Sequence, residues 1–255
     1  MTKRQPFLHN ARVATAFLTR IPVSHGDQLE MGCVARWFPT VGLFIGSCAA
    51  GTLWALEVLV GHRVAAVAVV LVGVLVTGGF HHDGLADSAD GLVGGWTPEQ
   101  RRQILKDSRH GTYGVLALVL QVVLQVSAVG AMPLNSAIPA VVLMHCLGRA
   151  AAVSVMRSGE GITEGLGANY VAGVRVRDIS VALVSSVMFG VAIAGVSALV
   201  AFICALVVAR GVIKYAVSRI GGIVGDVLGA TEQVAESTVL LVAMVFVEHF
   251  GGFGW

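Results

Sequence analysis

Hydrophobic residues follow one another in long uninterrupted runs along this chain of 255 residues. The runs cover residues 40–60, 64–80, 112–132, 137–156, 179–213 and 234–250. About 20 apolar helical residues cross the hydrocarbon core of a bilayer, and a helix satisfies its own backbone hydrogen bonds. The pattern therefore predicts an all-α fold, a polytopic transmembrane helical bundle in which residues 1–255 form a single integral membrane domain.

The run at 179–213 is too long for one ordinary span. Its 31 uncharged residues before Arg210 would form a single helix ~46 Å long at ~1.5 Å per residue. A hairpin that turns near residues 195–197 would instead return Arg210, Lys214 and Arg219 to the side of the other basic loops. This hairpin gives about seven spans, a cytoplasmic N-terminus and an external C-terminus, with fifteen of the seventeen basic residues inside. A single long helix is the open alternative.

Composition supports the lipid bilayer as the main surroundings of the chain. Hydrophobic residues make up 56% and charged residues 13%, with a mean hydropathy of +0.81, whereas soluble domains carry about a quarter charged residues. The net charge of +2 gives no reason to expect a nucleic-acid partner. The four cysteines lie far apart without a C-x-x-C pair, which argues against a disulfide framework or a zinc site. We expect no cleavable signal peptide, because the apolar patch in the first thirty residues is too short.

Polar residues concentrate in the segment 81–110, which carries nine of the charged side chains. Asp83, Asp87 and Asp90 are spaced so that a helix places them on one face within about 60° of arc. Three such carboxylates repel one another unless a cation or solvent lies among them. Oxygen ligands without nitrogen or sulfur favour Mg²⁺ or Mn²⁺, so we predict a metal site here. His81 and His82 directly precede the acids. Each is a candidate metal ligand or proton carrier, or an ordinary polar residue at the membrane interface.

The residues that follow the acids combine a helix start with a set of charges. Thr97 is a predicted N-cap, with Pro98 at the first helical position. The segment 106–112 then places two cations, a carboxylate and a hydroxyl just before a span: Lys106, Arg109, Asp107 and Ser108. Cations beside metal-binding carboxylates suit phosphate groups. Anchoring by positive charge on the inner side explains the bases as well, but it does not explain Asp107.

Two distant segments are candidates to join this site. Arg149 lies inside a predicted span with His145 one turn earlier, where an ionisable residue faces the protein interior and has a partner. The glycine-rich stretch 221–232 contains Asp226 and Glu232 on the same predicted side of the membrane. Its glycines permit close approach of a ligand, or they simply pack helices together. For Arg149 and His145, a purely structural pairing also remains open.

Taken together, these segments resemble the family of adenosylcobinamide-GDP ribazoletransferases, also called cobalamin (5′-phosphate) synthases. The resemblance is carried by five stretches in order along the chain, at 17–23, 37–42, 78–91, 106–112 and 225–230. The most specific stretch is 78–91, GGFHHDGLADSADG. Phe80 and His82 stand where the family is expected to have leucine-like residues, and His110 where it has an aliphatic one. These differences bear on fine geometry, because no carboxylate is lost.

The resemblance implies substrates, a cofactor and residue roles. The substrates are adenosylcobinamide-GDP and α-ribazole or α-ribazole 5′-phosphate, and the products are adenosylcobalamin or its 5′-phosphate and GMP. It places the protein in the bacterial cytoplasmic (inner) membrane, with 81–111 as a cytoplasmic catalytic segment. The predicted metal ligands for Mg²⁺ are Asp83, Asp87 and Asp90, which with Asp107 form the predicted catalytic set. The predicted substrate-binding residues are His81, Lys106, Ser108, Arg109, Arg149 and Asp226. Which acid is the base, the number of metal ions, the preferred lower base and homo-oligomerisation stay open.

Two other functions deserve comparison. CDP-alcohol phosphatidyltransferases also gather aspartates at a cytoplasmic helix end, but their D-G-x-x-A-R pattern is not met, since Asp87 follows Asp83-Gly-Leu-Ala. A cation-coupled transporter would place its acids in broken spans near the membrane midplane, whereas these acids cluster in a predicted cytoplasmic loop.

Overall fold

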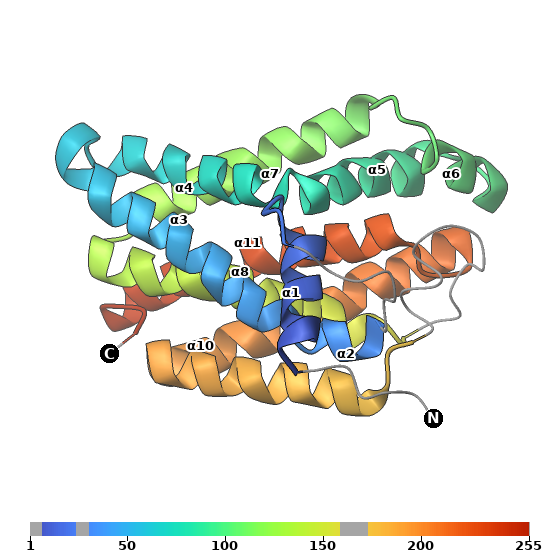
Figure 1. Cartoon of the computed structure of the whole chain (residues 1–255). Helices are drawn as coiled ribbons and strands as arrows, with labels where there is room; N and C mark the ends of the chain where they lie inside the picture. The colour runs from blue at the N-terminus through green and yellow to red at the C-terminus, as the bar shows by residue number, and fades with distance from the viewer. Residues whose placement is uncertain (1–6, 24–30, 159–172, 255) are drawn as a thin grey trace.

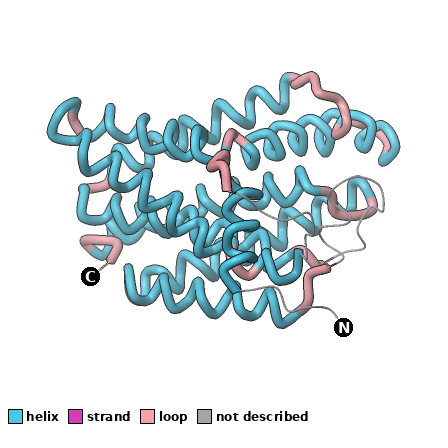
Figure 2. Tube along the Cα trace, in the orientation of Figure 1, coloured by secondary structure: helices cyan, strands magenta, loops and turns pink. Residues whose placement is uncertain are grey.

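The computed structural model describes residues 7–23, 31–158 and 173–254. Residues 1–6 and 24–30, on which the signal-peptide expectation partly rests, lie outside the described residues. The described residues fold into helices joined by loops, with no strand among them (Figure 1, Figure 2). The helices are α1 (Phe7–Leu18), α2 (Met31–Ala35), α3 (Phe38–Val60), α4 (His62–Thr77), α5 (Phe80–Gly94), α6 (Pro98–Ile104), α7 (Thr112–Ala131), α8 (Leu134–Val155), α10 (Val176–Ile220) and α11 (Gly225–Phe250). The predicted all-α fold is confirmed.

Five of these helices are long and apolar enough to cross a membrane: α3, α7, α8, α10 and α11. Helices α4 and α5 meet the same criteria only as a pair, with a bend of 93° between them. A total of seven spans requires this bent pair to count as one span and two arms of α10 to count separately. The number seven and the cytoplasmic position of the N-terminus stay predictions.

Helix α10 reverses direction near its middle. Ala194 (φ −138°, ψ 16°) and Gly195 (φ 58°, ψ −137°) leave the helical conformation, and the positive φ of Gly195 favours a residue without a Cβ. A Cβ built on Gly190 would lie 3.2 Å from the Cβ of Ala198, although eight residues of continuous helix would separate the two by ~12 Å. The two arms of α10 therefore lie side by side (Figure 1), and the predicted hairpin turn near residue 195 is confirmed.

The bend between α4 and α5 is held by the end of α1 and the residues after it. Gly78 and Gly79 both adopt positive φ, at 66° and 71°. The backbone N–H of Arg20 donates to the carbonyl oxygen of Val76 at 2.8 Å, and the Arg20 side chain lies across Gly78, where a Cβ would overlap it. Phe17 packs edge-on against the first residue of α5, with ring centroids 5.4 Å apart. These contacts fix the direction in which α5 leaves α4.

Helix α8 is the most deeply buried of the candidate spans, and it packs against α3, α10 and α11. Gly46 of α3 rests directly on it, since a Cβ there would lie 2.7 Å from the carbonyl oxygen of Val142. Small residues allow this close approach between membrane helices. The side chains of His145 and Arg149 on α8 are consequently surrounded by protein.

The start of α11 differs from the sequence prediction. The helix begins at Gly225 and not at residue 234. Its first turns contain the polar residues Thr231, Glu232 and Gln233, which lower the hydropathy of this stretch but are buried against other helices. Because these side chains find partners inside the protein, the helix extends over the glycine-rich stretch that hydropathy alone left out.

Helix α6 begins as predicted, with Thr97 as a capping-box residue and Pro98 in the first turn. Its two arginines point to another helix. The guanidinium groups of Arg101 and Arg102 donate to the last two carbonyl oxygens of α10 at 3.5 and 3.4 Å. Such terminal carbonyls have no partner within their own helix, so these two bases dock α6 onto α10.

Candidate active site

Helix α5 carries the three predicted metal ligands in three different environments. Asp83 is exposed, Asp87 is half-buried and Asp90 is buried. The Asp87 carboxylate interacts electrostatically with the other two. The carboxylate oxygens of these three residues do not all lie within 4.8 Å of one another. Among the described residues, the potential metal ligands that do lie this close together belong to a different set of side chains. The three acids thus lie on one helix, while the binding of a metal stays a prediction.

Asp226 of α11 joins the acids of α5, because the two helices meet at glycines. A Cβ on Gly84 would lie 2.8 Å from the carbonyl oxygen of Asp226, and a Cβ on Gly229 would lie 3.3 Å from the Cα of Gly84. The Asp226 carboxylate interacts electrostatically with Asp83 and Asp87. We call Asp83, Asp87 and Asp226 the acidic cluster.

Substitution of Gly84 by leucine is expected to destabilise the protein by about 1–3 kcal/mol, because the new side chain has to push α11 away from α5. Thermal unfolding of the purified protein in detergent measures the effect. Gly51 of α3 provides the matched control, since a Cβ there meets nothing within 4 Å. Equal unfolding midpoints for Gly84→Leu and Gly51→Leu would contradict the close packing of α5 on α11.

The segment 106–110 lies between the end of α6 and the start of α7 (Figure 1). His110 approaches the cluster, with its Nδ1 atom 3.6 Å from a carboxylate oxygen of Asp87. The side chains of Lys106, Ser108 and Arg109 are exposed. The predicted phosphate-binding residues therefore lie at the protein surface, in the same short segment as His110, which approaches Asp87.

Asp107 and Arg109 pair with each other within this segment. The Nη2 atom of Arg109 lies 2.6 Å from one carboxylate oxygen of Asp107, and Nε lies 3.0 Å from the other. These hydrogen bonds lower the pKa of Asp107 to about 2. A general base works best when its pKa is near the working pH, so Asp107 is a poor base for deprotonating a hydroxyl while Arg109 is paired with it.

Asp90 faces α7 and not the acidic cluster. Its two carboxylate oxygens accept hydrogen bonds from the backbone N–H groups of Gly111 and Gly114, at 2.7 and 2.9 Å. The sequence predicted Asp90 as a metal ligand and did not suggest that its carboxylate binds the backbone at the start of α7.

Helices α5, α8 and α11 bring five ionisable side chains together inside the bundle, all of them buried. The Nη1 atom of Arg149 lies 2.7 Å from Glu232 and 3.0 Å from Glu236. The Nδ1 atom of His145 lies 2.5 Å from Glu236, and that of His81 lies 3.4 Å from Glu232. We call these five residues the ionic network.

The sequence did not single out Glu236 as a site residue, although a signal was present. His145 and Arg149 on α8 and Glu232 and Glu236 on α11 are each spaced four residues apart, so each pair shares a helix face. His145, Glu232 and Glu236 are also close enough together to bind a metal ion. The Arg149 guanidinium already supplies a cation to both carboxylates, however. The substrate-binding roles of His81 and Arg149 stay predictions.

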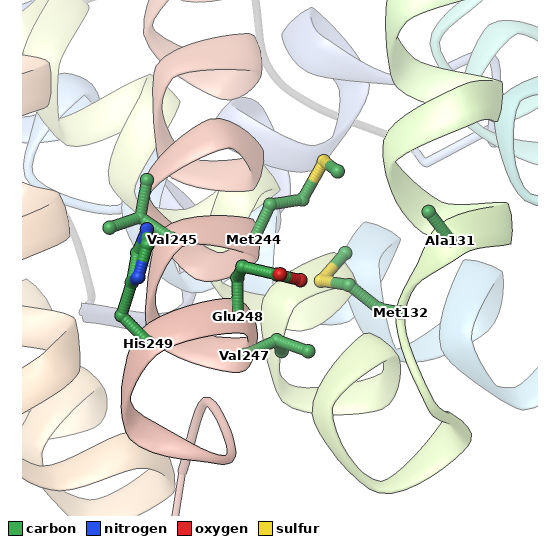
Figure 3. A pocket seen from close by; sticks show the side chains of 7 residues that line it. All are labelled: Ala131, Met132, Met244, Val245, Val247, Glu248 and His249. Atoms are coloured by element: carbon green, nitrogen blue, oxygen red, sulfur yellow. The ribbon is translucent and has the colours of Figure 1, made fainter.

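A cavity of about 280 Å³ lies elsewhere, where the ends of α7 and α11 meet (Figure 3). It is lined by Ala131, Met132, Met244, Val245, Val247, Glu248 and His249. The lining residues of α11 begin 18 residues after Asp226, which corresponds to ~27 Å along the helix. The cavity is therefore separate from the acidic cluster.

Comparison with known proteins places the chain in a family. The model of the family described as cobalamin-5-phosphate synthase matches residues 10–244. The chain belongs to this family. The adenosylcobinamide-GDP ribazoletransferase of Shewanella halifaxensis is 37% identical over 242 residues, 91% of this chain and 93% of the relative. Those of Shewanella pealeana and Shewanella frigidimarina are 34% and 35% identical, over 91% of this chain and 93% and 92% of the relatives. No solved structure matches.

The cobalamin-5-phosphate synthase resemblance predicted from five stretches is thereby confirmed, and the fold gives these stretches a common location. Residues 78–91 form the bend and most of α5, 225–230 form the start of α11, and 106–112 lead into α7. Residues 17–23 support the bend, and 37–42 begin α3. Four of the five stretches thus build or support the acidic cluster.

Proposed function

We propose that the chain transfers the cobinamide-phosphate moiety of adenosylcobinamide-GDP to α-ribazole or α-ribazole 5′-phosphate. A ribose hydroxyl attacks the phosphorus on the cobinamide side of the diphosphate. A new P–O bond forms, the P–O bond to the GMP phosphate breaks, and adenosylcobalamin or its 5′-phosphate is released with GMP. The relatives named above support this activity by their shared name. The observation that carries the proposal is the acidic cluster, which two distant segments of the chain build beside exposed cations.

The side chains of the acidic cluster suit Mg²⁺ as a cofactor. Asp83, Asp87 and Asp226 offer only carboxylate oxygens, which this ion prefers. The close contact of α5 with α11 at Gly84 leaves no room for another side chain between the two helices there. Bound there, Mg²⁺ would neutralise charge on the diphosphate and on the departing GMP. Asp90 fits this role less well, since both of its oxygens already accept backbone hydrogen bonds.

The residues of the chain would bind and orient the two substrates. Lys106 and Arg109 would neutralise the non-bridging phosphate oxygens, and the Ser108 hydroxyl would donate a hydrogen bond to the same group. A carboxylate of the acidic cluster, or Asp107, would accept the proton of the attacking hydroxyl. Surface exposure of these side chains leaves room for a large corrinoid substrate.

We place the protein in the inner membrane of a bacterium, with the acidic cluster on the cytoplasmic side. The bacterial origin of the relatives and the basic residues around the cluster support this orientation. The same topology puts the C-terminus outside. Alkaline phosphatase fused to the C-terminus should be active. If that fusion is inactive and a separate C-terminal fusion to green fluorescent protein is fluorescent, the orientation is the opposite of the one proposed.

The proposed activity is tested with the purified full chain in lipid nanodiscs. Incubation with adenosylcobinamide-GDP, α-ribazole and Mg²⁺ should release GMP and form adenosylcobalamin in equal amounts, both measured by chromatography. Omission of α-ribazole should stop GMP release, which separates transfer from hydrolysis. Absence of GMP from a folded protein with both substrates and Mg²⁺, with α-ribazole or its 5′-phosphate as acceptor, would overturn the proposal.

A further inference from the structure

We propose that Asp90 is a positioning residue that caps the N-terminus of α7 from α5 and thereby holds the segment 106–110 beside the acidic cluster. In this role Asp90 does not bind the metal. The effect on turnover rests on the proposed function, whereas the capping role is a property of the fold and has its own measurement.

The cap is built from two glycines and one distant carboxylate. In a capping box, the N-cap side chain binds the N–H of the third helical residue, whose side chain binds the N-cap N–H. In α7 these two positions are Gly111 and Gly114, and neither has a side chain to offer. The Asp90 carboxylate accepts both N–H groups, at 2.7 and 2.9 Å. Its negative charge also lies at the positive end of the helix dipole.

Both glycines are explained by the space that this carboxylate occupies. A Cβ on Gly111 would lie 2.6 Å from an oxygen of Asp90, and a Cβ on Gly114 would overlap the other oxygen. Backbone conformation does not require glycine at the first position, because Gly111 has a φ of −90° that other residues adopt. The two glycines therefore make room for the Asp90 side chain.

The cap fastens one end of the 106–110 segment, and a second contact fastens the other. Leu105, just before the segment, packs against Gly91 of α5, where a Cβ would lie 2.5 Å from the leucine Cγ. Between the two contacts, His110 lies 3.6 Å from Asp87. Lys106 and Arg109 are thus carried on a short segment that is attached to α5 at both ends.

Asp90→Asn tests the proposal, because the amide keeps the size of the side chain but can accept only one of the two hydrogen bonds. Gly114→Ala is the second variant, since its methyl group would displace the carboxylate. In nanodiscs, hydrogen exchange of the peptide 109–116 should accelerate about tenfold or more in both variants. Gly130→Ala, near the other end of α7, should exchange like the natural protein, because a Cβ there meets its nearest neighbour at 3.7 Å.

Turnover separates positioning from metal binding. In Asp90→Asn we expect kcat to fall about tenfold to a hundredfold, with an unchanged Mg²⁺ concentration for half-maximal activity. The double variant Asp90→Asn/Gly114→Ala should lose little more than either single variant, since both changes break one contact. An increased Mg²⁺ requirement in Asp90→Asn with unchanged exchange at 109–116 would overturn the proposal. Should the natural protein release no GMP, the proposed function fails, and the exchange measurement still decides the capping role.

Discussion

Replacing Arg149 with alanine is expected to destabilise the folded protein by about 3–5 kcal/mol, the usual cost of removing one partner from a buried ion pair. The side chain of Arg149 is 2% exposed, and those of Glu232 and Glu236 are 0% and 1% exposed. Without the guanidinium, two carboxylates would stay buried with the imidazoles of His81 and His145 as their neighbouring basic groups. Thermal unfolding of the purified protein in detergent should show a much lower midpoint, or the variant should yield little folded protein.

Two controls test whether the lost charge pairing causes this effect. Arg63→Ala removes an exposed arginine of α4 and should change stability by less than about 0.5 kcal/mol. The triple variant Arg149→Met/Glu232→Gln/Glu236→Gln removes all three charges and should recover most of the stability, because neutral replacements of buried ion pairs are often tolerated. Unfolding of Arg149→Ala at the natural midpoint would show that the ionic network does not hold α8 to α11.

The ionic network also bears on the transporter alternative. Beyond the buried Ser237, the buried residues along α11 are Val239, Leu240 and Ala243, so the polar stripe of this helix gives way to an apolar layer. A transporter binds its cation near the membrane midplane between the two aqueous sides. An ionic network that ends at such a layer and already contains its own cation fits the stabilisation of helix packing better than ion passage.

Hydropathy and charge predicted the long apolar helices because the bilayer imposes simple demands on each segment. Every backbone group must be satisfied within a span, so the apolar runs mark helices without reference to the rest of the fold. The turn near Gly195 followed from the side on which Arg210, Lys214 and Arg219 had to lie. The start of α6 was predictable from Thr97 and Pro98, since capping depends only on neighbours in sequence.

The contacts of polar residues between distant helices could not be predicted in this way. The two carboxylate partners of Arg149 lie 83 and 87 residues further along the chain. The helix faces that meet are determined by the packing of small residues such as Gly84 and Gly148. Periodicity predicted Asp90 on the face of Asp87, but it did not reveal that the Asp90 carboxylate turns toward α7. For the same reason, the basic residues of α6 gave no sign that they would cap α10.

The acidic cluster provides the second large effect: Asp87→Asn should reduce GMP release about a hundredfold or more, since metal stabilisation of the reacting phosphate amounts to several kcal/mol and 1.36 kcal/mol corresponds to a factor of ten. Asp87 is half-buried between Asp83 and Asp226, and removal of its charge relieves repulsion among them. The variant should therefore fold at least as stably as the natural protein, which separates lost catalysis from lost structure.

Glu99→Gln is the matched control for Asp87→Asn, because it neutralises an exposed carboxylate in the same segment of the chain, one that forms an ion pair with Arg102 of α6. It should retain the natural rate. GMP release is measured at several Mg²⁺ concentrations, with circular dichroism and thermal unfolding recorded on the same samples. Because the two variants remove the same charge, a loss confined to Asp87→Asn must come from the position of the carboxylate beside Asp83 and Asp226. Full activity in folded Asp87→Asn would instead remove this residue from the set that holds Mg²⁺.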